Sequence, residues 1–223
     1  MKRYRTLLFD VDDTILDFQA AEALALRLLF EDQNIPLTND MKEQYKTINQ
    51  GLWRAFEEGK MTRDEIVNTR FSALLEQKYR RFLEEGHQLI DGAFDLISNL
   101  QQQFDLYIVT NGVSHTQYKR LRDSGLCPFF KDIFVSEDTG FQKPMKEYFD
   151  YVFERIPQFS AEHTLIIGDS LTADIKGGQL AGLDTCWMNP DMKPNVPEII
   201  PTYEIRKLEE LYHILNIENT VSS

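Results

Sequence analysis

Residues 4–17 read YRTLLFDVDDTILD and pass from a short apolar run directly into a group of acidic side chains. The apolar part, Tyr4–Phe9, has the length and composition of a buried β-strand. Asp10 and Asp12 follow it two residues apart, so on extended backbone their side chains lie on the same face. Because crowded carboxylates repel each other, a cation or a bound proton must offset their charge. This stretch therefore predicts a buried strand that ends in a chemically active group.

Four more short apolar runs are bounded by polar residues or glycine and are interpreted as buried strands. They are Leu106–Val109, Ile133–Val135, Leu165–Ile167 and Thr185–Met188. Segments with helical periodicity separate most of the runs. They are Ala93–Gln102, His115–Asp123, Glu147–Arg155 and Leu171–Ala181. Alternation of this kind is typical of βαβ crossovers, so we expect an α/β fold with a Rossmann-like parallel sheet and helices on both faces.

One long segment, residues 18–87, interrupts the alternation between the first two strands. A crossover needs only about a dozen residues, so the rest of this segment is an insertion. Helices are expected at Ala20–Asp32, Asn39–Gly59 and Arg63–Glu85. Thr62 and Glu65 have the spacing of a capping box at the start of the last one. We predict an α/β core of residues 1–17 and 88–223, with a helical domain of residues 18–87 inserted after the first strand.

Polar residues follow several of the predicted strands, and the carboxyl ends of parallel strands share one edge of a sheet, where ligands bind. The set is Asp10, Asp12, Thr110, Asn111, Lys143, Asp169, Ser170 and Asp174. Carboxylates from neighbouring strands suit a hard cation such as Mg²⁺. A carboxylate can also attack phosphorus, while a second carboxyl group protonates the leaving oxygen and then activates water. A hydroxyl, backbone amides and a lysine ammonium would hold the phosphoryl oxygens.

Each of these residues also has a purely structural interpretation. Asp12 and Ser170 could cap helices, and residues 110–112, Thr-Asn-Gly, could form a turn. Lys143 before a proline could be an exposed residue at a helix start, and Asp174 could favour a first helical turn through the dipole. The joint occurrence of these residues at successive strand ends favours the chemical interpretation.

The charge balance of the chain limits the classes of binding partner that we expect. The chain carries 24 Lys plus Arg against 36 Asp plus Glu, a formal net charge of −12. We expect no nucleic-acid polymer and no membrane as a partner, because phosphate-rich surfaces need a basic face. No signal peptide and no run near the roughly 20 apolar residues of a membrane span are expected. These features predict a cytoplasmic protein that acts on a small molecule; they make no prediction of oligomeric state.

In their order along the chain, these residues resemble the motifs of the haloacid dehalogenase (HAD) superfamily of phosphohydrolases. The first motif, Asp-x-Asp-x-Thr or Val, is matched by residues 10–14, DVDDT, and the second, a Thr or Ser at a strand end, by Thr110. Lys143 matches the third motif, a single lysine. Residues 168–174, GDSLTAD, match the fourth. The inserted helices are similar to the cap domain of that superfamily, which closes over the site and excludes bulk water.

The resemblance implies a Mg²⁺-dependent phosphomonoester hydrolase that works through an aspartyl phosphate. Asp10 would be the nucleophile and Asp12 the general acid and base. Mg²⁺ would be bound by the side chains of Asp10 and Asp169 and by the main-chain carbonyl of Asp12. Two further groups of residues have implied roles. Thr110, Asn111 and Lys143 would bind the substrate phosphate. Ser170 and Asp174 would lie behind the metal ligands, where Asp174 would orient water or Lys143.

Within the superfamily, residues 9–18, FDVDDTILDF, residues 110–112 and the segment around residues 62–65, TRDE, resemble the bacterial pyrimidine 5′-nucleotidases. This resemblance implies nucleoside 5′-monophosphates such as UMP, dUMP and dTMP as substrates, chosen largely by the cap. An aromatic residue of the cap such as Trp53 or Phe71 could stack on a base, although such residues more often belong to a core.

Four other functions use similar residues. A sugar-phosphate phosphatase or a phosphomutase would form the same aspartyl phosphate. A dehalogenase would attack carbon without a metal and would leave no use for an acid at Asp12. A phospho-accepting receiver module is also an α/β protein with acids, a hydroxyl and a lysine, but its phosphorylated aspartate ends a middle strand and it has no large helical insertion. The sequence therefore favours the phosphomonoesterase.

Overall fold

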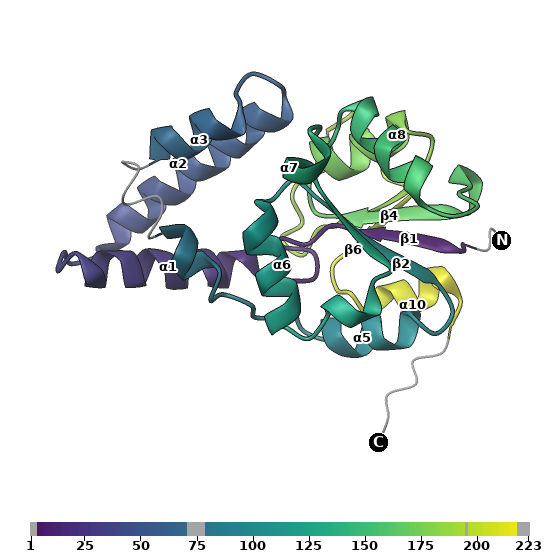
Figure 1. Ribbon diagram of the computed structural model, residues 1–223, viewed down its shortest axis with the longest axis horizontal. Helices are drawn as coiled ribbons and strands as arrows, with labels where there is room; N and C mark the ends of the chain where they lie inside the picture. The colour runs from purple at the N-terminus through teal and green to yellow at the C-terminus, as the bar shows by residue number, and fades with distance from the viewer. Residues whose placement is uncertain (1–3, 71–78, 195, 218–223) are drawn as a thin grey trace. The chain divides into compact units, whose positions relative to one another are not determined.

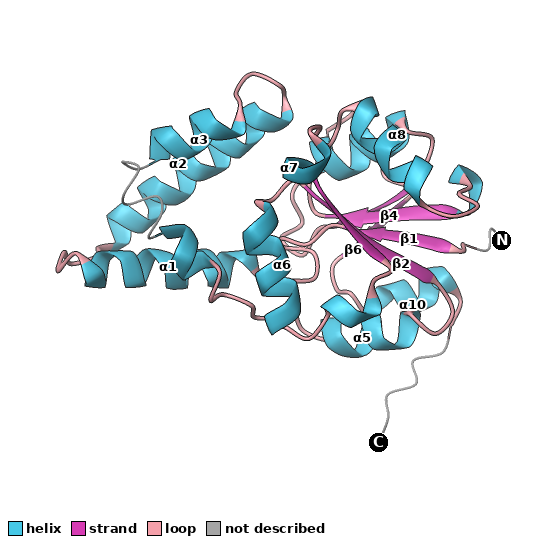
Figure 2. Ribbon diagram, viewed as in Figure 1, coloured by secondary structure: helices cyan, strands magenta, loops and turns pink. Residues whose placement is uncertain are grey.

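The structure, a computed structural model, describes residues 4–70, 79–194 and 196–217. The chain divides into two compact units. One consists of Met1–Asp17 together with Leu89–Ser223, and the other of Phe18–Gln88. Figure 2 shows that the strands belong to the first unit, whereas the described residues of the second form helices and loops.

The first unit is built on a six-stranded sheet with the order β3-β2-β1-β4-β5-β6, in which every pair of neighbours is parallel. The strands are β1 Thr6–Phe9, β2 Asp105–Thr110, β3 Asp132–Val135, β4 Thr164–Gly168, β5 Asp184–Met188 and β6 Tyr203–Ile205. The predicted Rossmann-like α/β fold is confirmed, and each of the five predicted strands is present. The sixth was not predicted, because three residues with one exposed glutamate give no apolar run.

Helices cover both faces of this sheet (Figure 1). They are α5 Ala93–Leu100, α6 Ser114–Asp123, α7 Ser136–Thr139, α8 Lys146–Arg155, α9 Gly177–Leu180 and α10 Glu210–Leu215, with a π-helix at Leu171–Lys176 leading into α9. Short 3-10 turns lie at Cys127–Phe129 and Ala161–His163. No helix in the described parts of the chain is long and apolar enough to cross a membrane.

Alternation along the strands divides the core into two layers. On β1, Leu7 and Phe9 pack in the layer that contains buried residues of α5 and α10, whereas Leu8 packs in the layer that contains those of α8. Burial of apolar area on both faces of the central strands is the main favourable term for such a core. This packing holds the central strands in place, and with them the residues that follow each strand end.

The strand register aligns the predicted site residues at one edge. Phe9 is paired with Ile108 on β2 and with Ile167 on β4. Asp10 is the next residue, while Thr110 and Asp169 lie two residues beyond their paired isoleucines. A tight loop follows, in which the N–H groups of residues 14–16 all donate to the carbonyl of Val11 and Asp13 has a positive φ of 53°. This loop keeps residues 10–16 at the edge.

The second unit contains α1 Phe18–Asp32, α2 Asn39–Glu57 and α3 Arg63–Arg70, and residues 79–83 are also helical. Its buried apolar residues include Leu26, Leu29 and Tyr79. The predicted capping box at the start of α3 is confirmed, since the Glu65 carboxylate accepts from the Thr62 N–H at 2.7 Å and the Glu65 N–H donates to Thr62 Oγ1 at 3.3 Å.

The two aromatic residues suggested for base stacking differ in what can be described. Trp53 is half-buried and makes an edge-to-face contact with Phe56, with ring centroids 5.8 Å apart. That contact is one expected of a packed aromatic pair. Phe71 lies outside the described residues.

Candidate active site

Asp10 occupies the position directly after β1. Its N–H donates to the carbonyl of Ile167 at 2.9 Å, so the backbone is held by the neighbouring strand. The residue is buried, and its Oδ1 accepts a hydrogen bond from the ammonium of Lys143 at 2.8 Å. Burial raises the pKa of Asp10 to about 8, although the charge of Lys143 opposes the rise. A charged Asp10 near neutral pH therefore needs further positive charge nearby.

Lys143, in the loop between α7 and α8, is a buried cation at this edge. Its Nζ donates to Asp10 Oδ1 at 2.8 Å, to Asp174 Oδ1 at 2.6 Å and to the carbonyl of Val109 at 2.7 Å. These acceptors take up the three N–H donors of an ammonium, so contact with a phosphoryl oxygen requires Lys143 to exchange one of them. Burial lowers the pKa of Lys143, but the charges of Asp10 and Asp174 outweigh this effect and raise it overall.

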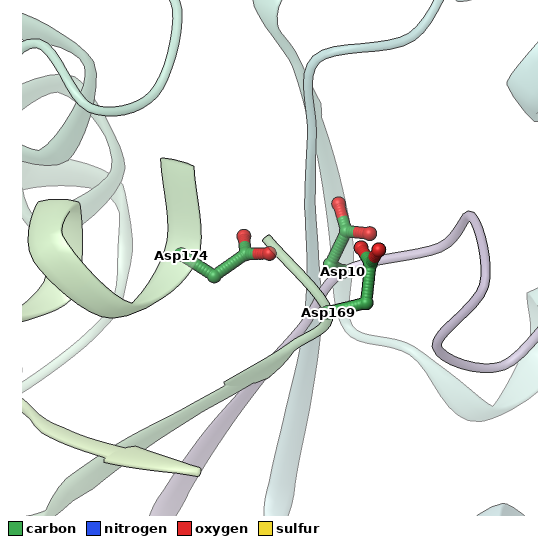
Figure 3. A group of neighbouring side chains, drawn as sticks. All are labelled: Asp10, Asp169 and Asp174. Carbon is green, nitrogen blue, oxygen red and sulfur yellow. The ribbon is translucent and has the colours of Figure 1, made fainter. Parts of the chain in front are cut away.

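Asp10, Asp169 and Asp174 form an acidic cluster, with one carboxylate oxygen of each within 4.8 Å of the others. Figure 3 shows Asp10 and Asp169 close together at adjacent strand ends and Asp174 on the helical turn beside them. Burial, followed by the charges of Asp10 and Asp174, raises the pKa of Asp169 well above its ordinary value. The Asp169 backbone is held in place, because its carbonyl accepts from the indole N–H of Trp187 at 2.8 Å.

The turn after β4 fits closely around Asp174. A β-carbon at Gly168 would overlap the Asp174 carboxylate, which is why this position needs a glycine. Asp174 Oδ2 accepts from the N–H of Ser170 at 3.0 Å, and Ser170 Oγ accepts from the N–H of Ala173 at 3.1 Å. Ser170 therefore caps the helical segment, the structural role that the sequence also allowed, and Asp174 contacts Lys143 directly.

The charges at this edge do not balance. Among the described residues, four carboxylates at this edge (Asp10, Asp12, Asp169 and Asp174) are accompanied by two cations that hydrogen-bond to them, Lys143 and Arg120, while the charges of Asp13 and Lys193 act on Asp169 in opposite directions. The excess matches the charge of one divalent ion. The donors are oxygens, which suits a hard ion such as Mg²⁺, and the raised pKa values of Asp10 and Asp169 show that positive charge is what their ionised forms require. The residues therefore fit a divalent cation.

Asp12 lies in the loop after Asp10 and faces α6. Its side chain is 31% exposed, and Oδ1 forms an ion pair with Arg120 Nη1 at 2.5 Å. Oδ2 accepts from Gln117 Nε2 at 2.9 Å. Neither Gln117 nor Arg120 is among the site residues predicted from the sequence. Residues 114–123, SHTQYKRLRD, have the composition of a solvent-exposed helix. The feature that could have indicated a role in the site is the i,i+3 spacing of Gln117 and Arg120, close in sequence to the Thr-Asn-Gly segment.

Thr110 ends β2, Asn111 follows it directly, and the two take different parts in the site. Thr110 is buried, and its Oγ1 accepts from Gln117 Nε2 at 2.9 Å and from the N–H of Gly112 at 3.2 Å. The Asn111 side chain holds the backbone of Lys143, because its amide nitrogen donates to the Lys143 carbonyl at 2.9 Å and its Oδ1 accepts from the Lys143 N–H at 2.8 Å. The side chain of Asn111 thus positions the lysine loop.

A comparison with protein families agrees with this geometry. A family model described as haloacid dehalogenase-like hydrolase matches residues 4–182, which is most of the chain. The match includes β1 to β4 and every residue of the acidic cluster.

Three similar proteins are informative. The crystal structure of the HAD-hydrolase YfnB from Bacillus subtilis, bound to magnesium, shares 93% of the sequence with a TM-score of 0.94, covering 97% of this chain and 100% of that one. Pyrimidine 5′-nucleotidase PynA of Streptococcus pneumoniae is 41% identical over 96% of this chain and 95% of its own. Pyrimidine 5′-nucleotidase YjjG of Escherichia coli is 29% identical over 94% and 96%.

Proposed function

The chain belongs to the haloacid dehalogenase-like hydrolase family, and on that premise we propose that it is a Mg²⁺-dependent phosphomonoesterase that works through an aspartyl phosphate on Asp10. The observation that carries the proposal is the position of Asp10. It is a buried carboxylate paired with Lys143 inside a cluster of three acids, which carry more negative charge than this ammonium offsets. A dehalogenase is disfavoured, because it has no use for the cation that this cluster fits.

In the first step the Asp10 carboxylate attacks phosphorus and the bond from phosphorus to the ester oxygen breaks. The carboxyl group of Asp12 gives its proton to that oxygen, so an alcohol leaves. In the second step the Asp12 carboxylate takes a proton from water as the water attacks phosphorus. The aspartyl–phosphate bond then breaks, which returns the Asp10 carboxylate and releases inorganic phosphate.

Other residues of the site stabilise charge as it spreads over the phosphoryl oxygens. Lys143 is the nearest buried ammonium, and Thr110, whose Oγ1 accepts from Gln117 and from the N–H of Gly112, contributes its O–H as a donor at the end of β2. The side chains of Asp10 and Asp169 and the main-chain carbonyl of Asp12 are the groups that would hold Mg²⁺. When bound, this ion would offset the excess negative charge and favour ionised Asp10.

We assign pyrimidine nucleoside 5′-monophosphates as the substrate class. The support is similarity over nearly the whole chain to PynA and YjjG, two proteins named as pyrimidine 5′-nucleotidases. The core residues at the sheet edge form hydrogen bonds and ion pairs with one another around Asp10 and Asp12, and these contacts concern the phosphate chemistry and not the base. Selection of the base is therefore assigned to the helical unit Phe18–Gln88.

One experiment tests both parts of the proposal. Phosphate release is measured from UMP, dUMP, dTMP, purine nucleotides and sugar phosphates, with Mg²⁺ and with EDTA. We expect the pyrimidine nucleotides to be preferred, EDTA to abolish turnover, and Asp10→Asn to lower kcat by at least about 10⁴-fold. Asp95→Asn, at an exposed position in α5, is the matched control and should retain full activity.

Three outcomes would each contradict a different part of the proposal: the mechanism, the substrate class or the reaction type. Turnover that survives EDTA or Asp10→Asn would refute the mechanism. A preference for sugar phosphates would refute the substrate class while keeping the chemistry. Isomerised sugar phosphate in place of free phosphate would identify a phosphomutase.

A further inference from the structure

Two buried polar side chains of α6, Gln117 and Arg120, are each 1% exposed. A buried guanidinium is costly unless it is paired and hydrogen-bonded. The Nη1 group of Arg120 meets this requirement, because it lies 2.5 Å from Oδ1 of Asp12, a residue 108 positions away in the sequence. The partner of the buried cation is thus the carboxylate assigned as general acid and base.

Gln117 completes the arrangement one helical turn earlier on the same face of α6. Its Nε2 donates to Asp12 Oδ2 and to Thr110 Oγ1, both at 2.9 Å, and its Oε1 accepts from Arg120 Nη1 at 3.2 Å. Each oxygen of the Asp12 carboxylate therefore has its own donor, which fixes the plane of the group. A carboxylate oxygen has two lone pairs, so each still has one for a proton or a water molecule.

The backbone is shaped to admit this contact. A β-carbon at Gly112 would lie 2.5 Å from both Cγ and Nε2 of Gln117, so the close approach of Gln117 to the end of β2 requires a glycine there. Apolar side chains could fill the same space between α6 and the sheet. The hydrogen-bonding pair is instead directed at a carboxylate that is 31% exposed toward solvent.

We propose that Gln117 and Arg120 are positioning residues that hold the Asp12 carboxyl group in the orientation needed for proton transfer, an inference that rests on the proposed function. An oriented acid matters most when the leaving group is a poor one. An alkyl phosphate needs a proton on the departing oxygen, whereas p-nitrophenolate leaves without one. Loss of the positioning residues should therefore discriminate between leaving groups, which a general loss of structure would not do.

The test compares kcat/KM for dTMP with kcat/KM for p-nitrophenyl phosphate, since this ratio reports the step in which the leaving group departs. Arg120→Met should lower kcat/KM for dTMP by about 10–100-fold, which is part of the usual contribution of a general acid. The same substitution should lower kcat/KM for p-nitrophenyl phosphate by less than about threefold. Gln117→Met should act in the same direction more weakly, and Arg120→Lys should restore part of the loss. In an Asp12→Asn background, Arg120→Met should have little further effect.

Lys119→Met is the matched control, because Lys119 lies on the same helix and pairs with Asp123 near the surface. It should leave both values unchanged. The inference would be overturned if Arg120→Met lowered kcat/KM equally for the two substrates, or if the effects of Arg120→Met and Asp12→Asn were additive. Arg120 would then have only a packing role. If Arg120→Met does not fold, Gln117→Met and Arg120→Lys decide by the same criterion. A wild-type protein that hydrolyses neither ester would instead refute the proposed function.

Discussion

Asp10 and Asp12 leave the same strand two residues apart, yet their surroundings differ in charge. On the nucleophile side (Asp10, Lys143, Asp169 and Asp174) one ammonium is shared by Asp10 and Asp174, and Asp169 adds a third carboxylate within 4.8 Å. On the acid side (Asp12, Thr110, Gln117 and Arg120) one guanidinium meets one carboxylate. The nucleophile side is thus built to receive another cation, whereas the acid side is balanced by the chain itself.

The two sides depend on partly different elements, although both use the end of β2. The nucleophile side is assembled from the end of β1, the turn and π-helix after β4 and the loop before α8, which is held by the Asn111 amide and by the Val109 carbonyl of β2. The acid side is assembled from the loop after β1, the end of β2 and one face of α6. Substitutions can therefore affect one side at a time, which makes the comparison testable.

The largest effect is expected from Lys143→Met. The substitution leaves two buried carboxylates without the ammonium that donates to both, and loss of one partner from a buried ion pair typically costs about 3–5 kcal/mol. We expect the metal-free protein to lose stability of this order in urea unfolding, and phosphatase activity to fall by at least about 10²–10³-fold. Arg120→Met should cost less stability, because Asp12 can be hydrated.

Lys146→Met provides the control for this prediction. Lys146 is three residues further along and pairs with Asp150 on the exposed side of α8. An exposed pair of this kind contributes about 0.5 kcal/mol or less, so stability and activity should hardly change. If Lys143→Met resembled Lys146→Met, the buried ammonium would not be what holds the nucleophile side together.

A more gradual effect, smaller within any one pH unit than the loss expected from Lys143→Met, is expected from pH on the metal-free protein. The pKa of Asp10 is about 8 in the folded state, against about 3.9 for an ordinary aspartate, so the folded state binds this proton more tightly. The free energy of unfolding should therefore fall as pH rises from about 4 to about 8, by up to about 1.4 kcal/mol per pH unit for this proton. The raised pKa of Asp169 acts in the same direction.

Urea unfolding across this pH range measures the effect. Asp10→Asn should remove its share of the slope, and saturating Mg²⁺ should flatten the slope because it favours ionised carboxylates. Arg120→Met should change the slope little, because burial raises the pKa of Asp10 more than the charge of Asp12 does. A metal-free wild type whose stability rises with pH relative to Asp10→Asn would contradict the assignment of excess negative charge to the nucleophile side.

Much of the nucleophile side follows from local sequence. Short apolar runs predict strands, the strand order of a parallel sheet brings their ends to one edge, and Asp10 and Asp169 stand directly after such runs. The same reasoning missed β6 and α10, because segments of three and six residues carry too little periodic signal. It also missed α7, which has four residues.

The acid side was harder to predict for a physical reason. Hydrophobic periodicity reports the burial of apolar residues, and Gln117 and Arg120 are buried through hydrogen bonds instead. Their partner Asp12 is more than a hundred positions away, so neither residue's role appears in its own neighbourhood. The clamp of Asn111 on Lys143, which spans 32 positions, was missed for the same reason.

The smallest and most selective effects are expected from two glycines, one on each side. A methyl group at Gly168 would overlap the Asp174 carboxylate and displace it from Lys143. We expect Gly168→Ala to destabilise the protein by about 1–3 kcal/mol, to weaken Mg²⁺ binding and to slow dTMP and p-nitrophenyl phosphate hydrolysis by the same factor. At Gly112 the methyl would meet the buried Gln117 side chain, so Gly112→Ala should also cost about 1–3 kcal/mol but slow dTMP hydrolysis alone.

Gly51→Ala in α2 controls for the added methyl group, since a β-carbon there meets no atom within 4 Å. It should stabilise the protein slightly through helix propensity and leave the ratio of the two kcat/KM values unchanged. Thermal unfolding with and without Mg²⁺, together with the two substrates, separates the two glycines. The two sides would be one coupled unit if Gly112→Ala weakened Mg²⁺ binding as strongly as Gly168→Ala, or if it slowed hydrolysis of both substrates equally. Either result would mean that displacement of Gln117 alters the position of Asp10 as well as that of Asp12.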